Sequence, residues 1–154
     1  MLPRDFTQAV TGAFRGVDDI RPSVWADAEV APVTVVGETH LEGALVVQRW
    51  EERRADSTFE VVNVFMADAA SDEILLYSFD TAGFPADPPA RGRWSGGCVD
   101  LLRKTPRGES CTTFVAAGNG FRWSKIYRRD PGHPWTTVVE GVLTREGSGA
   151  GPAR

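Results

Sequence analysis

Lys125 is the residue whose neighbours in the sequence most strongly favour chemistry. In the segment Phe121–Arg129, aromatic residues alternate with mostly polar ones, and the aromatic face consists of Phe121, Trp123, Lys125 and Tyr127. If this face of a strand points inward, burial between two rings lowers the pKa of the amine. Lys125 is then a candidate anion clamp, imine former or base, with Tyr127 as its partner in acid and base catalysis. The alternative is that Lys125 extends from the rim and keeps its amine in water.

A second set of candidates comes from a predicted hairpin around the turn at residues 54–57. Pairing Trp50 with Phe59 places Arg49 opposite Glu60, a favourable charge pair for the solvent face. The other face is apolar and aromatic with two amides, which is typical of a small-molecule pocket. It comprises Ala44, Val46, Gln48, Trp50, Phe59, Val61, Asn63 and Phe65. The alternative is that these side chains fill the interior, with the two amides bonded to each other or to water.

The acidic residues are weaker candidates. Asp80 precedes Thr-Ala-Gly, so it is expected to cap a turn rather than to catalyse a reaction. Glu140 falls on a face taken as outward, where an exposed salt bridge is expected. Asp100 is expected near Cys111 across a hairpin, and this placement alone supports no mechanism.

The sequence predicts no metal site and no nucleophile system. His40 lies beside a turn and His133 lies within Asp-Pro-Gly-His-Pro, and neither has a second His, Cys or carboxylate at ligand spacing. A Gly-x-Ser-x-Gly elbow is also missing. We therefore expect no metal and no cofactor.

The elements that position these residues are predicted to be strands. Nine segments rich in β-branched and aromatic residues follow one another, separated by turn-forming residues. They are Val33–Glu38, Leu41–Arg53, Thr58–Met66, Glu73–Asp80, Arg91–Gly96, Cys98–Lys104, Glu109–Ala116, Phe121–Arg129 and Trp135–Arg145. Short connectors join them as an antiparallel meander. Closure removes the exposed edges, so the expected fold is an all-β barrel of about eight to ten strands.

Helical spacing occurs only in Phe6–Phe14, with Asp5 available as an N-cap. The residues that share one face are Phe6, Ala9, Val10 and Ala13. This pattern predicts a short helix that covers one end of the barrel. We expect one barrel domain over residues 1–146 and a flexible, glycine-rich tail over residues 147–154.

The composition limits the binding partners and the cellular compartment that we expect for this protein. The chain of 154 residues carries a net charge of -4. It therefore lacks the excess of positive charge that attracts the phosphates of nucleic acids, and we do not expect a nucleic acid as its partner. No run approaches the roughly 20 apolar residues that span a membrane, and the N-terminus has no apolar leader, so a cytoplasmic protein is expected. Two cysteines, Cys98 and Cys111, are expected as thiols. A homodimer is an alternative to a monomer that the sequence does not exclude.

Short motifs occur in a fixed order along residues 8–145. They are Gly12-Ala13-Phe14-Arg15-Gly16, Leu41-Glu42-Gly43, Tyr77-Ser78-Phe79-Asp80-Thr81-Ala82-Gly83, Gly92-Arg93-Trp94-Ser95-Gly96, and Trp135 with Glu140-Gly141 and Thr144-Arg145. Together they resemble the bacterial lipocalin-like proteins of unknown function that share the calycin barrel with lipocalins, fatty-acid-binding proteins and nitrobindins, with Phe14 replacing the first motif's tryptophan. The resemblance implies a barrel with a central cavity, but no shared reaction or ligand. The histidine that holds haem in nitrobindins has no counterpart here, because His133 belongs to a turn.

The leading hypothesis is a barrel that binds a small hydrophobic molecule, aromatic or polyene-like, in a central cavity. The expected lining residues are Trp50, Phe59, Phe65, Trp123 and Tyr127, and the residues expected to orient the ligand are Gln48, Asn63 and Lys125. A first alternative is a cofactor-free cyclase or isomerase that uses the same cavity, with Lys125 and Tyr127 as the catalytic pair. A second is a barrel without a pocket that acts through surface contacts.

Overall fold

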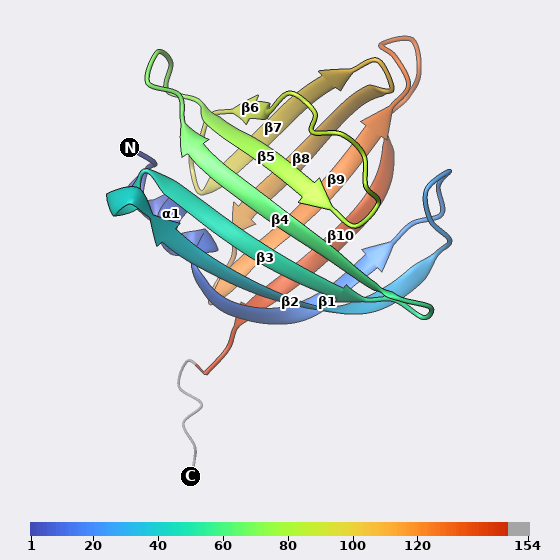
Figure 1. The fold of residues 1–154 in the computed structure, drawn as a ribbon, viewed down its shortest axis with the longest axis horizontal. Helices are drawn as coiled ribbons and strands as arrows, with labels where there is room; N and C mark the ends of the chain where they lie inside the picture. Colours follow the sequence, from blue (N-terminus) through green and yellow to red (C-terminus); the bar gives the residue numbers. More distant parts are fainter. Residues whose placement is uncertain (148–154) are drawn as a thin grey trace.

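The computed structural model describes residues 1–147, which fold into a closed antiparallel barrel of ten strands with one short α-helix (Figure 1). In chain order the elements are α1 (Arg4–Val10), β1 (Gly12–Ile20), β2 (Glu29–His40), a 3-10 turn (Leu41–Gly43), β3 (Leu45–Arg53), β4 (Thr58–Ala67), β5 (Ile74–Asp80), β6 (Ala90–Gly92), β7 (Cys98–Thr105), β8 (Gly108–Ala116), β9 (Gly120–Arg128) and β10 (Thr136–Arg145). Each strand pairs with its neighbours in the chain, and β1 closes the barrel against β10. The predicted closed antiparallel meander is therefore confirmed.

The seam between β1 and β10 explains why the opening strand contains glycines. Residue Gly16 lies opposite Leu143, and a Cβ atom on Gly16 would stand 1.9 Å from the carbonyl oxygen of Val142. Only glycine allows the two backbones to approach so closely. The first motif of the sequence thus serves barrel closure.

The predicted helix over Phe6–Phe14 is too long. The observed helix ends at Val10, and Gly12 has a φ of 115°, a conformation that interrupts the helix and begins β1. From Gly12 onward inward and outward residues alternate, so Phe14 is a strand residue. Pro3 rather than Asp5 occupies the N-cap position, and Asp5 lies in the first turn.

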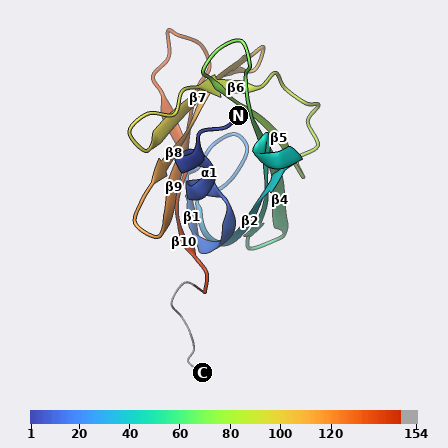
Figure 2. The same cartoon turned by 90° about the vertical axis from the view of Figure 1, so that its left-hand side faces the viewer.

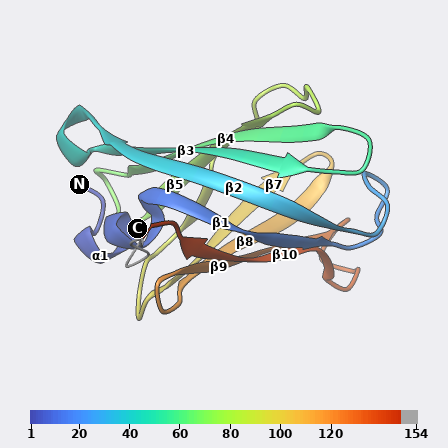
Figure 3. The ribbon, with the colours of Figure 1, turned by 90° about the horizontal axis from the view of Figure 1, so that it is seen from below.

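As predicted, α1 covers one end of the barrel, which we call the helix end; Figures 2 and 3 show α1 at this end. Phe6 and Val10 are fully buried and point from the helix into the interior. Phe6 meets Phe65 at a ring distance of 5.2 Å, and Phe14 meets Phe121 at 4.9 Å. The helix end is thus a packed aromatic core.

The predicted register of the β3–β4 hairpin is wrong by two residues. Trp50 pairs with Val61, and Phe59 pairs with Glu52. The expected Arg49–Glu60 pair therefore does not form, and Arg49 instead has Glu38 at 3.8 Å. A shift of two residues keeps the strand side chains on their predicted faces, so the inward set is unchanged except for Ala44, which follows the 3-10 turn and precedes β3.

Other details bear on the earlier expectations. Cys98 and Cys111 are free thiols, as predicted. Within residues 1–147, no helix has the length and apolar character needed to cross a membrane. Of the predicted tail, all but its first residue lies outside the described residues.

Candidate functional site

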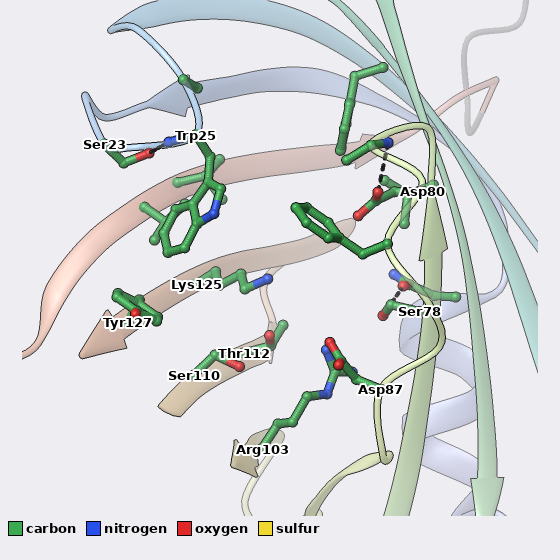
Figure 4. A pocket seen from close by; sticks show the side chains of 18 of the residues that line it. Ser23, Trp25, Ser78, Asp80, Asp87, Arg103, Ser110, Thr112, Lys125 and Tyr127 are labelled. Carbon is green, nitrogen blue, oxygen red and sulfur yellow. Dashed lines mark hydrogen bonds between the residues drawn. The ribbon is translucent and has the colours of Figure 1, made fainter. Parts of the chain in front are cut away.

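The end of the barrel opposite α1, which we call the cavity end, holds a cavity of about 300 Å³ (Figure 4). Its wall combines aromatic side chains with charged and hydroxyl groups from most of the strands. The aromatic members are Trp25, Trp50, Phe59, Phe84, Trp123 and Tyr127. The principal polar members are Asp18, Glu52, Arg54, Asn63, Ser78, Asp80, Asp87, Arg103, Arg107, Glu109, Ser110, Thr112 and Lys125.

Aromatic contacts hold the apolar part of the wall in place. Trp50 and Trp123 meet edge to face at 4.9 Å and also pack against the core, so they separate the cavity from the helix end. Trp25, from the connection between β1 and β2, meets Tyr127 at 4.7 Å. Rings held in this way present a preformed apolar surface to a ligand.

Lys125 points into the cavity, as its alternation with aromatic residues predicted (Figure 4). Its amine has no hydrogen bond and no carboxylate within 4.0 Å among residues 1–147. Burial lowers its pKa, and the positive charge of Arg103 lowers it further, while Asp80 and Asp87 oppose the change. This side chain is therefore a basic group held in the cavity without a partner in the described structure.

Arg103 is a second cation in the same wall. Its Nη2 atom donates to the carbonyl oxygen of Leu76 at 3.3 Å, but its buried Nε atom has no hydrogen-bond acceptor in the described structure. Burial lowers the pKa of Arg103 as well. No carboxylate of residues 1–147 lies within ion-pair distance of it. Arg103 thus keeps unused donors inside the barrel.

Three adjacent strands place hydroxyl groups beside these cations. The β8 residue Ser110 pairs with Arg103 on β7 and Tyr127 on β9, and Thr112 pairs with Lys125 on β9. Both hydroxyls line the cavity. Neither side chain makes a hydrogen bond within the described part of the chain.

Asp18 forms a buried acid in the deeper wall. It is fully buried, its Oδ1 atom accepts from Trp123 Nε1 at 2.8 Å, and its Oδ2 atom has no donor. Burial and a hydrogen bond with Glu52 raise its pKa to about 9. Glu52 is itself paired with Arg54 at 2.7 Å. A proton on Asp18 makes its contact with Glu52 a hydrogen bond between two acids, so Asp18 is neutral at pH 7.

The rim at the mouth is held by its own contacts. Arg107 pairs with Asp87 at 2.6 Å and covers the ring of Phe84 at 5.0 Å. Tyr127 donates its hydroxyl proton to the carbonyl oxygen of Arg107. The carboxylate of Asp80 accepts from the backbone N–H of Ala82 at 2.9 Å, so its predicted turn-capping role is confirmed (Figure 4).

Six of the eight residues predicted to bind a ligand line this cavity. They are Trp50, Phe59, Asn63, Trp123, Lys125 and Tyr127. Gln48 and Phe65 face inward as expected, but they lie toward the helix end and do not reach the cavity. Gln48 donates to the carbonyl oxygen of Val10 at 3.0 Å and accepts from Trp50, and Phe65 packs between Phe6 and Phe114.

Several lining residues were missed by reasoning from the sequence. Asp18 was missed because Gly12–Ile20 was not assigned as a complete strand. Arg103 was missed because a single arginine in Cys98–Lys104 resembles any exposed strand residue. The available signal was the strand period of two, which places Arg103 on the same face as buried Val99 and Leu101.

The remaining candidates lie away from the cavity. Glu140 is exposed and pairs with Arg21 at 3.4 Å, which confirms its predicted role. Asp100 accepts from Thr113 at 2.6 Å on the outer surface. His133 contacts Asp130 at 2.9 Å within its turn. No group of three potential metal ligands occurs in the part of the chain that the structure describes.

Comparisons with known proteins identify a similar fold for this chain but no family to which it belongs. No family model and no curated protein matches this chain. It is similar in structure to Rv2717c from M. tuberculosis, known from a crystal structure, with a TM-score of 0.69 and 13% sequence identity. The match covers 95% of this chain and 99% of that one. At this identity the likeness shows that the two proteins share the barrel fold.

Proposed function

We propose that this protein is a calycin-like barrel that binds a small molecule with an aromatic or otherwise apolar body at the cavity end. The observation that carries the proposal is the cavity of about 300 Å³ with Trp25, Trp50 and Trp123 in its wall. That volume lies at the lower limit of the roughly 300–1,000 Å³ that small-molecule sites occupy. It suits a ligand of one or two fused rings.

The alternative of a completely filled barrel conflicts with the difference between the two ends. Side chains fill the helix end, whereas at the cavity end the Lys125 amine has no partner and the Arg103 guanidinium has an unsatisfied Nε atom and no carboxylate within ion-pair distance in the described structure. Burying unpaired cations against apolar side chains costs several kcal/mol, and open space for water or a ligand avoids that cost.

The catalytic alternative has less support from the geometry. Tyr127, the expected acid, commits its hydroxyl proton to the carbonyl oxygen of Arg107. Asp18, the other protonated group, is turned toward Glu52 and Trp123. Neither proton is available to a ligand, so binding is the function that the arrangement favours.

A neutral fluorescent probe tests the proposal. N-phenyl-1-naphthylamine should bind the wild-type protein with increased emission, and Val61→Trp should abolish the increase by filling the cavity with an indole. Val62→Trp is the matched control, because Val62 is the next residue of β4 and is 37% exposed on the outer surface. No binding by the wild type, or equal loss in both variants, would contradict the proposal. Native mass spectrometry of protein taken directly from cells would then identify the bound molecule.

A further inference from the structure

We propose that the cavity selects an anion: a small aromatic acid whose carboxylate lies between Lys125 and Arg103 and accepts hydrogen bonds from Ser110 and Thr112. This inference rests on the proposed binding function and names the class of ligand. Its argument depends on the charges inside the cavity and on how β7, β8 and β9 arrange their donors.

Most charges in the cavity wall already have partners. Arg54 pairs with Glu52 at 2.7 Å, and Arg107 pairs with Asp87 at 2.6 Å. The carboxylate of Glu109 pairs with Arg128 at 3.0 Å. These side chains hold one another in place and leave no net charge for a ligand to neutralise.

The other acids do not neutralise the two remaining cations. Asp18 is protonated and faces Glu52, and Asp80 caps its own turn at the exposed end of β5. Asp80 and Asp87 act on Lys125 only from beyond 4.0 Å. Lys125 and Arg103 therefore form a basic site on the inner wall that no carboxylate of the described residues contacts within 4.0 Å, and an anion bound between them would favour the charged form of the Lys125 amine.

Backbone register places suitable donors between the two cations. Thr112 pairs with Lys125 on one side of β8, while Ser110 pairs with Arg103 on the other side. All four side chains lie on the inner face and reach toward the same space (Figure 4). An amine, a guanidinium and two hydroxyls are the donors that stabilise a desolvated carboxylate.

The same site disfavours other ligands of similar shape. A cationic ligand placed between Lys125 and Arg103 would be repelled, because neither side chain has a carboxylate within ion-pair distance in the described wall. A neutral ligand without an acceptor would displace water from both side chains without replacing its hydrogen bonds, and a neutral amide would offer them one uncharged carbonyl oxygen. The carboxylate of an aromatic acid would accept hydrogen bonds from Lys125 and Arg103, and its ring would pack against Trp50 and Trp123.

Three probes with one ring system and different charges test this inference. Calorimetric titration of the full chain at pH 7 would compare 2-naphthoate, 2-naphthamide and 2-naphthylmethylammonium. We expect the carboxylate to bind at least about tenfold more tightly than the amide, because charged hydrogen bonds supply the difference, and the ammonium to bind weakest. Equal or tighter binding of the amide would overturn the anion inference while leaving the binding function intact. If N-phenyl-1-naphthylamine binds and 2-naphthoate does not, the anion inference also fails; if none of the four probes binds, the proposed function fails.

The chain offers a matched pair of variants, because its only lysines are Lys104 and Lys125. Lys125→Met should weaken 2-naphthoate binding by about 10- to 100-fold and change 2-naphthamide binding by no more than about twofold. Lys104→Met, at an exposed position of β7 outside the cavity, should change neither. Equal weakening of both probes by Lys125→Met would mean that Lys125 has only a structural role, and would overturn its assignment.

A second substitution keeps the inference testable if Lys125→Met fails to fold. Arg103→Gln removes the other charge while keeping a side chain of similar reach. It should also weaken 2-naphthoate selectively over 2-naphthamide, by about tenfold or more. Unchanged selectivity in a folded Arg103→Gln protein would remove Arg103 from the site and overturn the two-cation arrangement.

Discussion

The two ends of the barrel interior are built from the same strands but differ in how completely their polar groups are satisfied. At the helix end, the buried amide of Gln48 lies among closely packed phenylalanines. It donates a hydrogen bond to the carbonyl oxygen of Val10 and accepts one from the indole N–H of Trp50. At the cavity end Lys125 and Arg103 have unused donors beside open space. We infer that the helix end stabilises the fold, whereas the cavity end keeps donors free for binding at some cost to stability.

The largest expected contrast is between two phenylalanines of the same strand. Phe65→Ala removes a fully buried ring from the helix end and should lower the free energy of unfolding by about 3–5 kcal/mol. Phe59→Ala removes a ring that faces the cavity and should cost less than about 1.5 kcal/mol, because little close packing is lost. Chemical denaturation of both variants measures the difference. Equal costs would mean that the cavity end is packed like the helix end.

A second contrast concerns polar groups. Gln48→Leu leaves the carbonyl oxygen of Val10 and the indole N–H of Trp50 without partners, and should destabilise the protein by about 2–3 kcal/mol. Ser110→Ala removes a hydroxyl that bonds to no described group and should change stability by less than about 0.5 kcal/mol. Denaturant melts of the two variants provide the measurement. A large cost for Ser110→Ala would show that its hydroxyl is already used.

The protonated Asp18 predicts a pH dependence of stability. Its pKa is raised to about 9 in the folded chain from an ordinary value of 3.8, so the folded protein holds a proton that the unfolded chain releases. The stabilisation is complete below pH 3.8 and is lost as the pH rises toward 9. One such proton gives a slope of up to about 1.4 kcal/mol per pH unit.

Asp18→Asn should flatten this slope, because the amide keeps an acceptor for Trp123 and offers a donor to Glu52 without titrating. Denaturation at a series of pH values measures it. The control is Asp19→Asn, at the neighbouring exposed position, which should leave the slope in place. A wild-type protein whose stability does not fall between pH 5 and 8 would contradict the assignment of a neutral Asp18.

The smallest expected effect is a gain in stability. Lys125→Met replaces an unpartnered amine by an apolar side chain of similar length and should raise the free energy of unfolding by roughly 1 kcal/mol. Lys104→Met should change it by less than about 0.5 kcal/mol. If Lys125→Met destabilised the protein instead, the amine would have a structural partner, and the contrast between the two ends would be weakened.

The order of β2 to β10, the closed meander and the inward position of Lys125 could be predicted from the sequence alone, whereas β1 was not assigned as a strand. These features depend on local patterns: turn residues between apolar runs, and side chains that alternate between faces within one strand. Even the wrong register of β3 and β4 left the inward residues of both strands correct, because a shift of two residues preserves the faces.

The sequence does not distinguish the inward residues that pack in the core from those that line the cavity, because this depends on the three-dimensional arrangement of the barrel. Gln48 and Trp50 are two residues apart on one strand, yet only Trp50 reaches the cavity, because α1 covers the barrel on the Gln48 side. Likewise, Arg103 joins Lys125 only through the pairing of β7 and β9 with β8. Local alternation specifies the direction of a side chain, but its depth along the barrel and its partners depend on residues distant in the sequence.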